Sequence, residues 1–281
     1  MHRDVLRALP LMLLAMSLIP AGDTAGKLLG EAGVAPAFTA WSRFALGAVM
    51  ILPFVLHLTR PAIFADWRVW LRGLLLAGGI VSILTALGTE PIANVFGAFF
   101  LGPILAYVLS AWLLNEGFSR ARMVLLGIGF LGVLLVVRPG FGMTPGLGFA
   151  VMAGVFYGGF LTASRWLSDI AHPGALLLSQ LVVGALVLAP FGLTAWPELE
   201  PRILALTLGS ALGSMLGNLC LILALRMAPA SGLAPFVYTQ LIAATVLGWA
   251  VFDALPDALT LTGLAVLVVS GLATLALRAR R

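Results

Sequence analysis

The chain has 281 residues, of which 61% are hydrophobic and only 10% are charged, and its mean hydropathy is +1.10. Soluble globular domains contain about 45 to 50% apolar residues, so this composition excludes such a domain and indicates a membrane protein. The net charge of +5 does not indicate nucleic-acid binding, because the basic residues are spread over short loops instead of clustering on one face. One cysteine and three histidines near segment ends exclude a disulfide framework and a thiolate metal cluster, so no metal or cofactor is expected.

Ten apolar segments follow one another along the chain, each bounded by clusters of proline, glycine and charged residues. A helix needs about 20 predominantly apolar residues to cross a bilayer, so the pattern predicts an all-α integral membrane protein with ten transmembrane helices. The connections are too short to contain a further domain. The predicted helices are Val5–Gly26, Pro36–Leu58, Trp70–Gly88, Pro91–Leu114, Met123–Val137, Gly146–Leu167, Pro173–Thr194, Ile203–Leu225, Ser231–Phe252 and Ala258–Leu277.

Basic residues are distributed unequally between the two ends of these helices. If the N-terminus is cytoplasmic, 12 of the 16 Lys and Arg residues lie at cytoplasmic ends, Lys27, Arg138 and Arg202 lie at outer ends, and Arg43 lies inside a span. Positive charge is favoured at the cytoplasmic ends of membrane helices, so both termini are expected in the cytoplasm. The distribution therefore predicts a multi-pass protein of the inner, or cytoplasmic, membrane.

The two halves of the sequence are copies of each other. Each half, residues 1–140 and 141–281, contains five predicted helices, and this odd number requires the second copy to be inverted in the membrane. Inverted repeats are typical of secondary transporters, whose substrate site lies near the midplane between the halves. An offset of 137 aligns Gly22 with Gly159, Pro36 with Pro173, Ser42 with Ser179, Pro53 with Pro190 and Trp112 with Trp249, and an offset of 138 aligns Ala86 with Ala224.

Two stretches, one in each copy, carry the same kind of motif. They are Ala86–Leu87, Pro91, Pro103, Trp112–Glu116 and Gly127, Gly129 and Gly132 in the first copy, and Ala224–Leu225, Pro235 and Trp249–Asp253 in the second. With these stretches the whole chain resembles the drug/metabolite transporter superfamily, in particular its EamA-type members, and its size and repeat are similar to the YddG-type amino-acid exporters. The resemblance implies export of amino acids or related small metabolites. Asp253 departs from the glutamate that the resemblance implies at its position.

Polar side chains inside the predicted helices indicate a binding site, because they cost free energy in hydrocarbon unless they face a cavity or a partner. Gln240 is the leading candidate, since an amide can bind both the ammonium and the carboxylate of a zwitterion. The alternative for each candidate is a hydrogen bond between helices, and for Trp41 a place in the interfacial aromatic belt. The remaining candidates for the cavity wall are Asn218, Tyr157, Tyr238, Asn94, Ser82, Ser214, Trp41 and Gln180.

Two further features predict contacts between helices. Asp23 late in the first helix and Arg43 early in the second are expected at a similar depth, where they could form a structural ion pair, act as an outer gate or contact substrate. Lys27 is expected to extend to the interface. A stripe of small residues lets another helix approach closely, and it consists of Ala205, Gly209, Gly213 and Gly217 beside Ser210, Ser214 and Asn218.

Pro103 and Pro235 lie in the helices richest in candidate site residues, so they are predicted hinges unless they only set a fixed curvature. No GxxxxGK[ST] motif is present, so ATP is not the direct driver. No titratable group lies at the centre of the predicted bundle, which favours facilitated transport by alternating access.

Other functions stay open as alternatives. They are a multidrug exporter of cationic compounds, a proton-coupled metabolite antiporter and, from a different class, a membrane scaffold or a lipid transferase. Catalytic groups that converge at one depth are not found, so an enzyme is not expected. The expected partners are a small-molecule substrate and the lipid bilayer, and the expected oligomeric state is a monomer.

Overall fold

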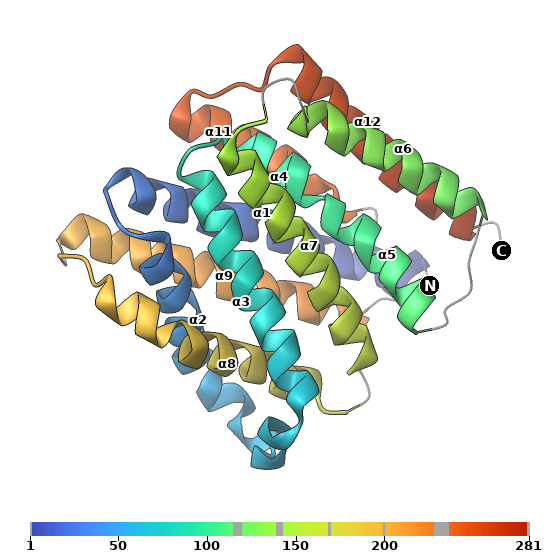
Figure 1. Ribbon diagram of the computed structural model, residues 1–281. Coiled ribbons are helices and arrows are strands. Elements are labelled where there is room, and N and C mark those ends of the chain that lie inside the picture. Colours follow the sequence, from blue (N-terminus) through green and yellow to red (C-terminus); the bar gives the residue numbers. More distant parts are fainter. Residues whose placement is uncertain are drawn as a thin grey trace.

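The computed structural model describes residues 2–114, 120–138, 143–167, 170–198, 200–227 and 236–279, and these residues form helices joined by short turns, with no β-strand among them (Figure 1). Seven of the described helices are long and apolar enough to cross a membrane: Leu6–Glu31, Pro36–Leu58, Trp67–Leu87, Ile92–Leu113, Pro145–Trp166, Pro173–Thr194 and Pro201–Leu221. Three further apolar helices are shorter: Met123–Val137, Thr239–Phe252 and Ala258–Ala273.

The helices follow the predicted segments closely, and the helix predicted over Pro173–Thr194 begins and ends at these residues. Two short 3-10 helices, Leu56–Leu58 and Pro61–Ala65, connect the helix Pro36–Val55 to the helix Trp67–Leu87. Pro235 and the beginning of the predicted helix Ser231–Phe252 lie outside the described residues. The elements are α1 (His2–Glu31), α2 (Pro36–Val55), α3 (Trp67–Leu87), α4 (Ile92–Phe99), α5 (Leu101–Leu113), α6 (Arg120–Val137), α7 (Pro145–Trp166), α8 (Pro173–Thr194), α9 (Pro201–Met227), α11 (Thr239–Phe252) and α12 (Ala258–Ala279).

The predicted span Pro91–Leu114 is observed as the apolar span Ile92–Leu113, but its helix is interrupted at Phe100, which divides it into α4 and α5. Pro103 has no N–H to donate to the carbonyl four residues earlier, which is that of Phe99. Gly154 of α7 lies directly against this carbonyl, since a Cβ on Gly154 would be 2.9 Å from the Phe99 oxygen. The proline and the close helix together account for the position of the break.

α1 continues past the predicted end at Gly26 to Glu31, because the charge of Lys27 has hydrogen-bond partners. The Lys27 ammonium donates to the backbone carbonyls of Leu87 (2.6 Å) and Glu90 (2.9 Å), so it binds the end of α3 and the turn that follows it. A cation is favoured there, because the C-terminal end of a helix carries unpaired carbonyls and partial negative charge.

α3 begins three residues before the predicted start at Trp70. The carboxylate of Asp66 accepts from the amide of Arg68 (2.9 Å) and caps the helix. The Arg68 guanidinium and this amide hold the pKa of the Asp66 carboxyl below its usual value. The early start places Arg72 as the sixth residue of the helix and buries it.

The main helix pairs each join one helix of residues 1–140 to one of residues 141–281 (Figure 1). α1 packs against α9, α3 against α7, α2 against α8, and α6 against α12 along one edge of the bundle. Only part of the predicted small-residue stripe on α9 contacts α1. A Cβ on Gly213 would lie 2.8 Å from the Gly22 backbone of α1, whereas a Cβ on Gly209 would meet nothing within 4 Å.

Candidate functional site

A cavity of about 320 Å³ lies between the two halves of the bundle. Its wall comes from α1 to α4 of the first half and from α7, α8, α9 and the region of α11 in the second. Most of the wall is apolar, with aromatic rings from Phe96, Phe99, Tyr157 and Phe160. The polar lining residues among the described part of the chain are Asp23, Arg43, Arg72, Tyr157, Ser164, Gln180, Ser214, Asn218 and Gln240.

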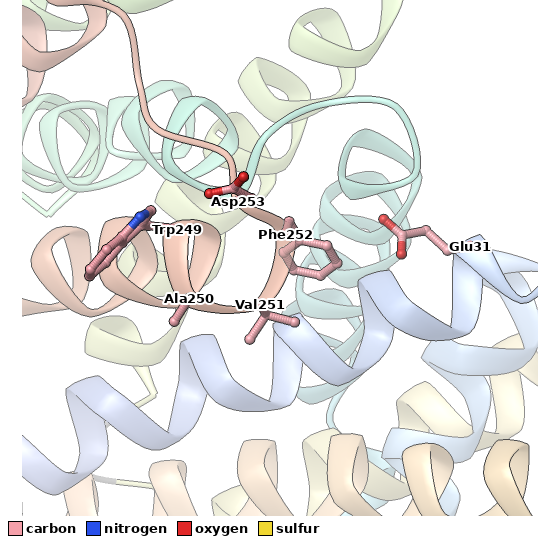
Figure 2. Close-up of a pocket in the computed structure, with 6 residues that line it drawn as sticks. All are labelled: Glu31, Trp249, Ala250, Val251, Phe252 and Asp253. Carbon is pink, nitrogen blue, oxygen red and sulfur yellow. The ribbon is translucent and has the colours of Figure 1, made fainter.

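A second depression, of about 670 Å³, lies at the surface where α1 and α11 end (Figure 2). It is lined by Glu31 and by residues 249–253. The carboxylates of Glu31 and Asp253 lie on either side of the Phe252 ring and do not converge on a common point. This depression therefore offers no arrangement that would hold a ligand, and the cavity between the halves is the candidate site.

Five of the predicted binding residues line this cavity. They are Gln240, Asn218, Tyr157, Ser214 and Gln180, and the predicted pair Asp23 and Arg43 lines it as well. Gln240 and Gln180 are both buried, at 7% and 5% exposure. The Asn218 amide donates to the Ser214 carbonyl (2.8 Å), and the Tyr157 ring packs against Phe99 with 4.7 Å between ring centroids.

Gln180 differs from the other amides in one respect. Its Oε1 is buried and has no hydrogen-bond partner among the described residues. A buried acceptor without a partner costs about 1 to 3 kcal/mol, and most such groups in folded proteins are satisfied. A ligand N–H in the cavity would satisfy this oxygen.

Four predicted residues do not line the cavity. The Tyr238 ring packs on Phe100, with 5.3 Å between centroids, and fills the space beside Gly271 of α12, where an added Cβ would lie 2.0 Å from the ring. Trp41 packs against Phe38 and Trp196, with centroids 6.0 and 5.8 Å away. Ser82 is buried in helix packing, and Asn94 of α4 holds a buried Oδ1 without a partner among the described residues. For these residues the sequence did not show which neighbour the side chain would face.

Asp23 and Arg43 form a buried ion pair at the cavity wall. The Arg43 Nη1 donates to Asp23 Oδ1 (2.5 Å), and its Nε donates to Ser210 Oγ (2.7 Å). Its Nη2 donates to the Gly22 carbonyl (2.7 Å), which also accepts from Ser210 Oγ (3.0 Å). This network joins α1, α2 and α9, and it pairs the Asp23 carboxylate with Arg43 through Oδ1.

Arg72 is a cavity residue that the sequence reasoning missed. Its Nε donates to Ser164 Oγ (2.8 Å) of α7, its Nη1 donates to the Leu176 carbonyl (2.9 Å) of α8, and the guanidinium lies over Phe160, 4.9 Å from the ring centroid. The residue is only 7% exposed. It was counted among the arginines at cytoplasmic helix ends, because the helix was predicted to begin at Trp70. The available signal was its helical spacing from Leu76, Gly79 and Ile83, which line the same cavity.

The apolar helices define a multi-pass membrane protein, and the cavity between its halves is the candidate site for a small molecule. In the described part of the chain, no group of three or more His, Cys, Asp or Glu residues could hold a metal ion. The chain belongs to the EamA-like transporter family, whose model matches residues 6–138 and again residues 144–276.

Three curated relatives carry different small molecules. The chain is 27% identical to an S-adenosylmethionine uptake transporter of Rickettsia bellii, over 91% of this chain and 89% of the relative. It is 29% identical to the pseudopaline exporter CntI of Pseudomonas aeruginosa, over 72% of each chain, and 27% identical to a riboflavin transporter of Vibrio cholerae, over 81% and 78%. A solved crystal structure matches with a TM-score of 0.67 and 23% identity, over 100% of this chain and 98% of that one, which shows the fold alone.

Proposed function

We propose that the protein is a secondary transporter that exports amino acids or related small metabolites across the inner membrane by alternating access. It has ten membrane spans in two inverted five-helix halves, residues 1–140 and 141–281, with both termini in the cytoplasm, and it works as a monomer. The observation that carries the proposal is the cavity of about 320 Å³ whose wall, mostly apolar with a few polar groups, both halves supply. A scaffold has no use for such a cavity.

Reciprocal helix contacts support the inverted repeat. α1 and α9 are the first and eighth predicted spans, and α7 and α3 are the sixth and third, so the two pairs exchange under the repeat. Aligned glycines in the two pairs make equivalent contacts. A Cβ on Gly217 would meet the Ala15 carbonyl, and a Cβ on Gly79, which the offset of 138 aligns with Gly217, would meet the Ala153 carbonyl. The two separate matches of the family model also support two copies.

The chemistry of the cavity favours a metabolite over a cationic drug. Asp23 is the one carboxylate among the described lining residues, and its ion pair with Arg43 leaves it unavailable to a cation. The relatives include carriers of S-adenosylmethionine, pseudopaline and riboflavin, and the first of these compounds contains an α-amino acid group. Their named directions differ, so export rests on the family resemblance and not on these relatives.

In the proposed orientation, the cavity reaches the cytoplasmic ends of several helices. Arg72 lies near the beginning of α3, Ser164 near the end of α7 and Pro173 at the beginning of α8. The Asp23–Arg43 pair lies toward the opposite side, where it closes the wall between α1, α2 and α9. We propose that the pair is an outer gate and that the α4–α5 break before Pro103 is a hinge, with a second hinge at Pro235 outside the described residues.

Gln240→Ala and Asn218→Ala are expected to lower transport while the yield of folded protein stays unchanged. Each removes an amide from the cavity wall, and one hydrogen bond contributes about 0.5 to 1.5 kcal/mol, or roughly 2- to 10-fold in apparent affinity. The measurement is initial uptake into liposomes at a range of substrate concentrations. Ser17→Ala is the control, because this exposed hydroxyl bonds only within its own helix in the described structure. Wild-type uptake by both amide variants would remove these residues from the site.

Collapsing the proton gradient is expected to leave the transport rate unchanged. Among the described lining residues the titratable carboxylate is held in an ion pair, and no histidine is present. The measurement compares uptake before and after addition of a protonophore. A large loss of rate would instead support the proton-coupled antiporter.

A further inference from the structure

Arg72 presents unused hydrogen-bond donors to the cavity. A guanidinium has five N–H donors, and only two of those on Arg72 have acceptors among the described residues, Ser164 Oγ and the Leu176 carbonyl. No carboxylate partner is found for it in the part of the chain that the structure describes. The lining residues therefore carry two arginines and one aspartate, which leaves one positive charge facing the cavity.

The repeat shows why this arginine lacks an acid. In the first network Arg43 of α2 meets Asp23 of α1 and Ser210 of α9. The offset of 137 aligns Asp23 with Phe160, and the offset of 138 aligns Ser210 with Arg72. The contacts of Arg72 form the second network, in which the arginine comes from α3. Its guanidinium lies 4.9 Å from the ring centroid of Phe160, the residue aligned with the carboxylate of the first network. A ligand carboxylate would complete the second network as Asp23 completes the first.

An acceptor without a described partner lines the same cavity as these donors. The offset of 137 aligns Arg43 with Gln180, whose Oε1 is buried without a described partner and whose side chain lines the cavity. The Leu176 carbonyl that accepts from Arg72 is four residues before Gln180, which is one turn of α8 or about 6 Å. Arg72 and Gln180 thus reach the same cavity at neighbouring turns of α8, where one small molecule can offer its carboxylate to the guanidinium and its ammonium to the amide oxygen.

We infer that Arg72 binds the carboxylate of the substrate and that Gln180 Oε1 accepts from its ammonium, so the site takes α-amino acids and derivatives with a free amino acid group. The rest of the substrate lies against the rings of Phe99, Tyr157 and Phe160. Arginine suits this role because its fork of donors matches the two oxygens of a carboxylate. The inference rests on the proposed function and specifies its substrate class.

The test measures binding of three probes to the purified protein by the ligand-induced rise in melting temperature, which needs no transport. The probes are L-phenylalanine, its methyl ester and N-acetyl-L-phenylalanine. The wild type is expected to bind phenylalanine at least tenfold more tightly than either derivative. Arg72→Gln is expected to lose at least tenfold in affinity for phenylalanine but little for the ester, and Gln180→Leu to lose affinity for phenylalanine but little for the N-acetyl form.

Two variants separate binding from folding. Arg72→Lys keeps the charge and is expected to keep part of the preference for phenylalanine over its ester, even if Arg72→Gln does not fold. Arg68→Gln, one turn earlier on α3 and outside the cavity wall, is expected to bind like the wild type.

Equal wild-type binding of phenylalanine and its ester, or no binding of phenylalanine at all, would overturn the inference. Liposome uptake of metabolites without a carboxylate would in that case still sustain the proposed function. No uptake of any metabolite would count against the proposed function itself.

Discussion

Asp23→Asn is expected to lower the free energy of unfolding by about 3 to 5 kcal/mol, because it leaves the buried Arg43 guanidinium without a counter-charge. Both side chains are at most 5% exposed, so water does not screen the pair. The loss also weakens the junction of α1, α2 and α9, since the same guanidinium bonds Ser210 and the Gly22 carbonyl. The measurement is thermal unfolding of the purified protein in detergent.

The contribution of the pair can be isolated with two further variants. The double variant Asp23→Asn with Arg43→Gln removes both charges and is expected to be more stable than Asp23→Asn alone. Together with the single variant Arg43→Gln it completes a double-mutant cycle, which gives the coupling energy of the pair. As a control, Asp66→Asn breaks the half-buried pair with Arg68, which lies outside the bundle core, and is expected to have little effect. An unchanged melting temperature for Asp23→Asn would show that the ion pair does not stabilise the fold.

Gly213→Ala is expected to destabilise the protein by about 1 to 3 kcal/mol through overpacking at the crossing of α1 and α9. The added Cβ would lie 2.8 Å from Cα and N of Gly22 and 3.0 Å from the Leu18 carbonyl. These are backbone atoms, so a rotamer change cannot relieve the contact and the two helices must separate. Thermal unfolding measures the effect.

Gly209→Ala is the matched control, because it changes the same residue type one turn earlier on α9. Its Cβ would meet nothing within 4 Å, so the variant is expected to gain roughly 0.5 to 1 kcal/mol from the lower backbone entropy of alanine. If both variants changed stability equally, the close crossing at Gly213 would not be what holds α1 against α9.

The apolar segments and the proline, glycine and charged residues that bound them predicted most of the helices. Crossing a bilayer requires a minimum number of consecutive apolar residues, which is visible in the sequence. The bounds of α8 and the positions of Asp23 and Arg43 at a common depth followed from this alone. The break at Phe100 did not, because Pro103 kinks a helix only as far as neighbouring helices allow, and Gly154 of α7 is distant in sequence.

The faces of the side chains were harder to predict than their depth. Gln180 and Tyr238 are both polar residues in apolar helices, yet Gln180 lines the cavity and the Tyr238 ring packs against Phe100 and Gly271. Arg72 was missed for a local reason. Asp66 caps α3, so the helix begins at Trp67 and Arg72 lies in its second turn, where it is buried. The direction in which these side chains face depends on which helices pack together. That packing is set by contacts between residues distant in the sequence.

Counterflow uptake into liposomes tests most directly whether the cavity between the halves serves transport. Purified protein is reconstituted, the liposomes are loaded with unlabelled amino acids, and entry of radiolabelled neutral and basic amino acids is followed against protein-free liposomes. A facilitative amino-acid carrier is expected to take up several of them, saturably and at the same rate with or without a pH gradient. The absence of uptake for every amino acid by folded protein would contradict the proposed substrate class.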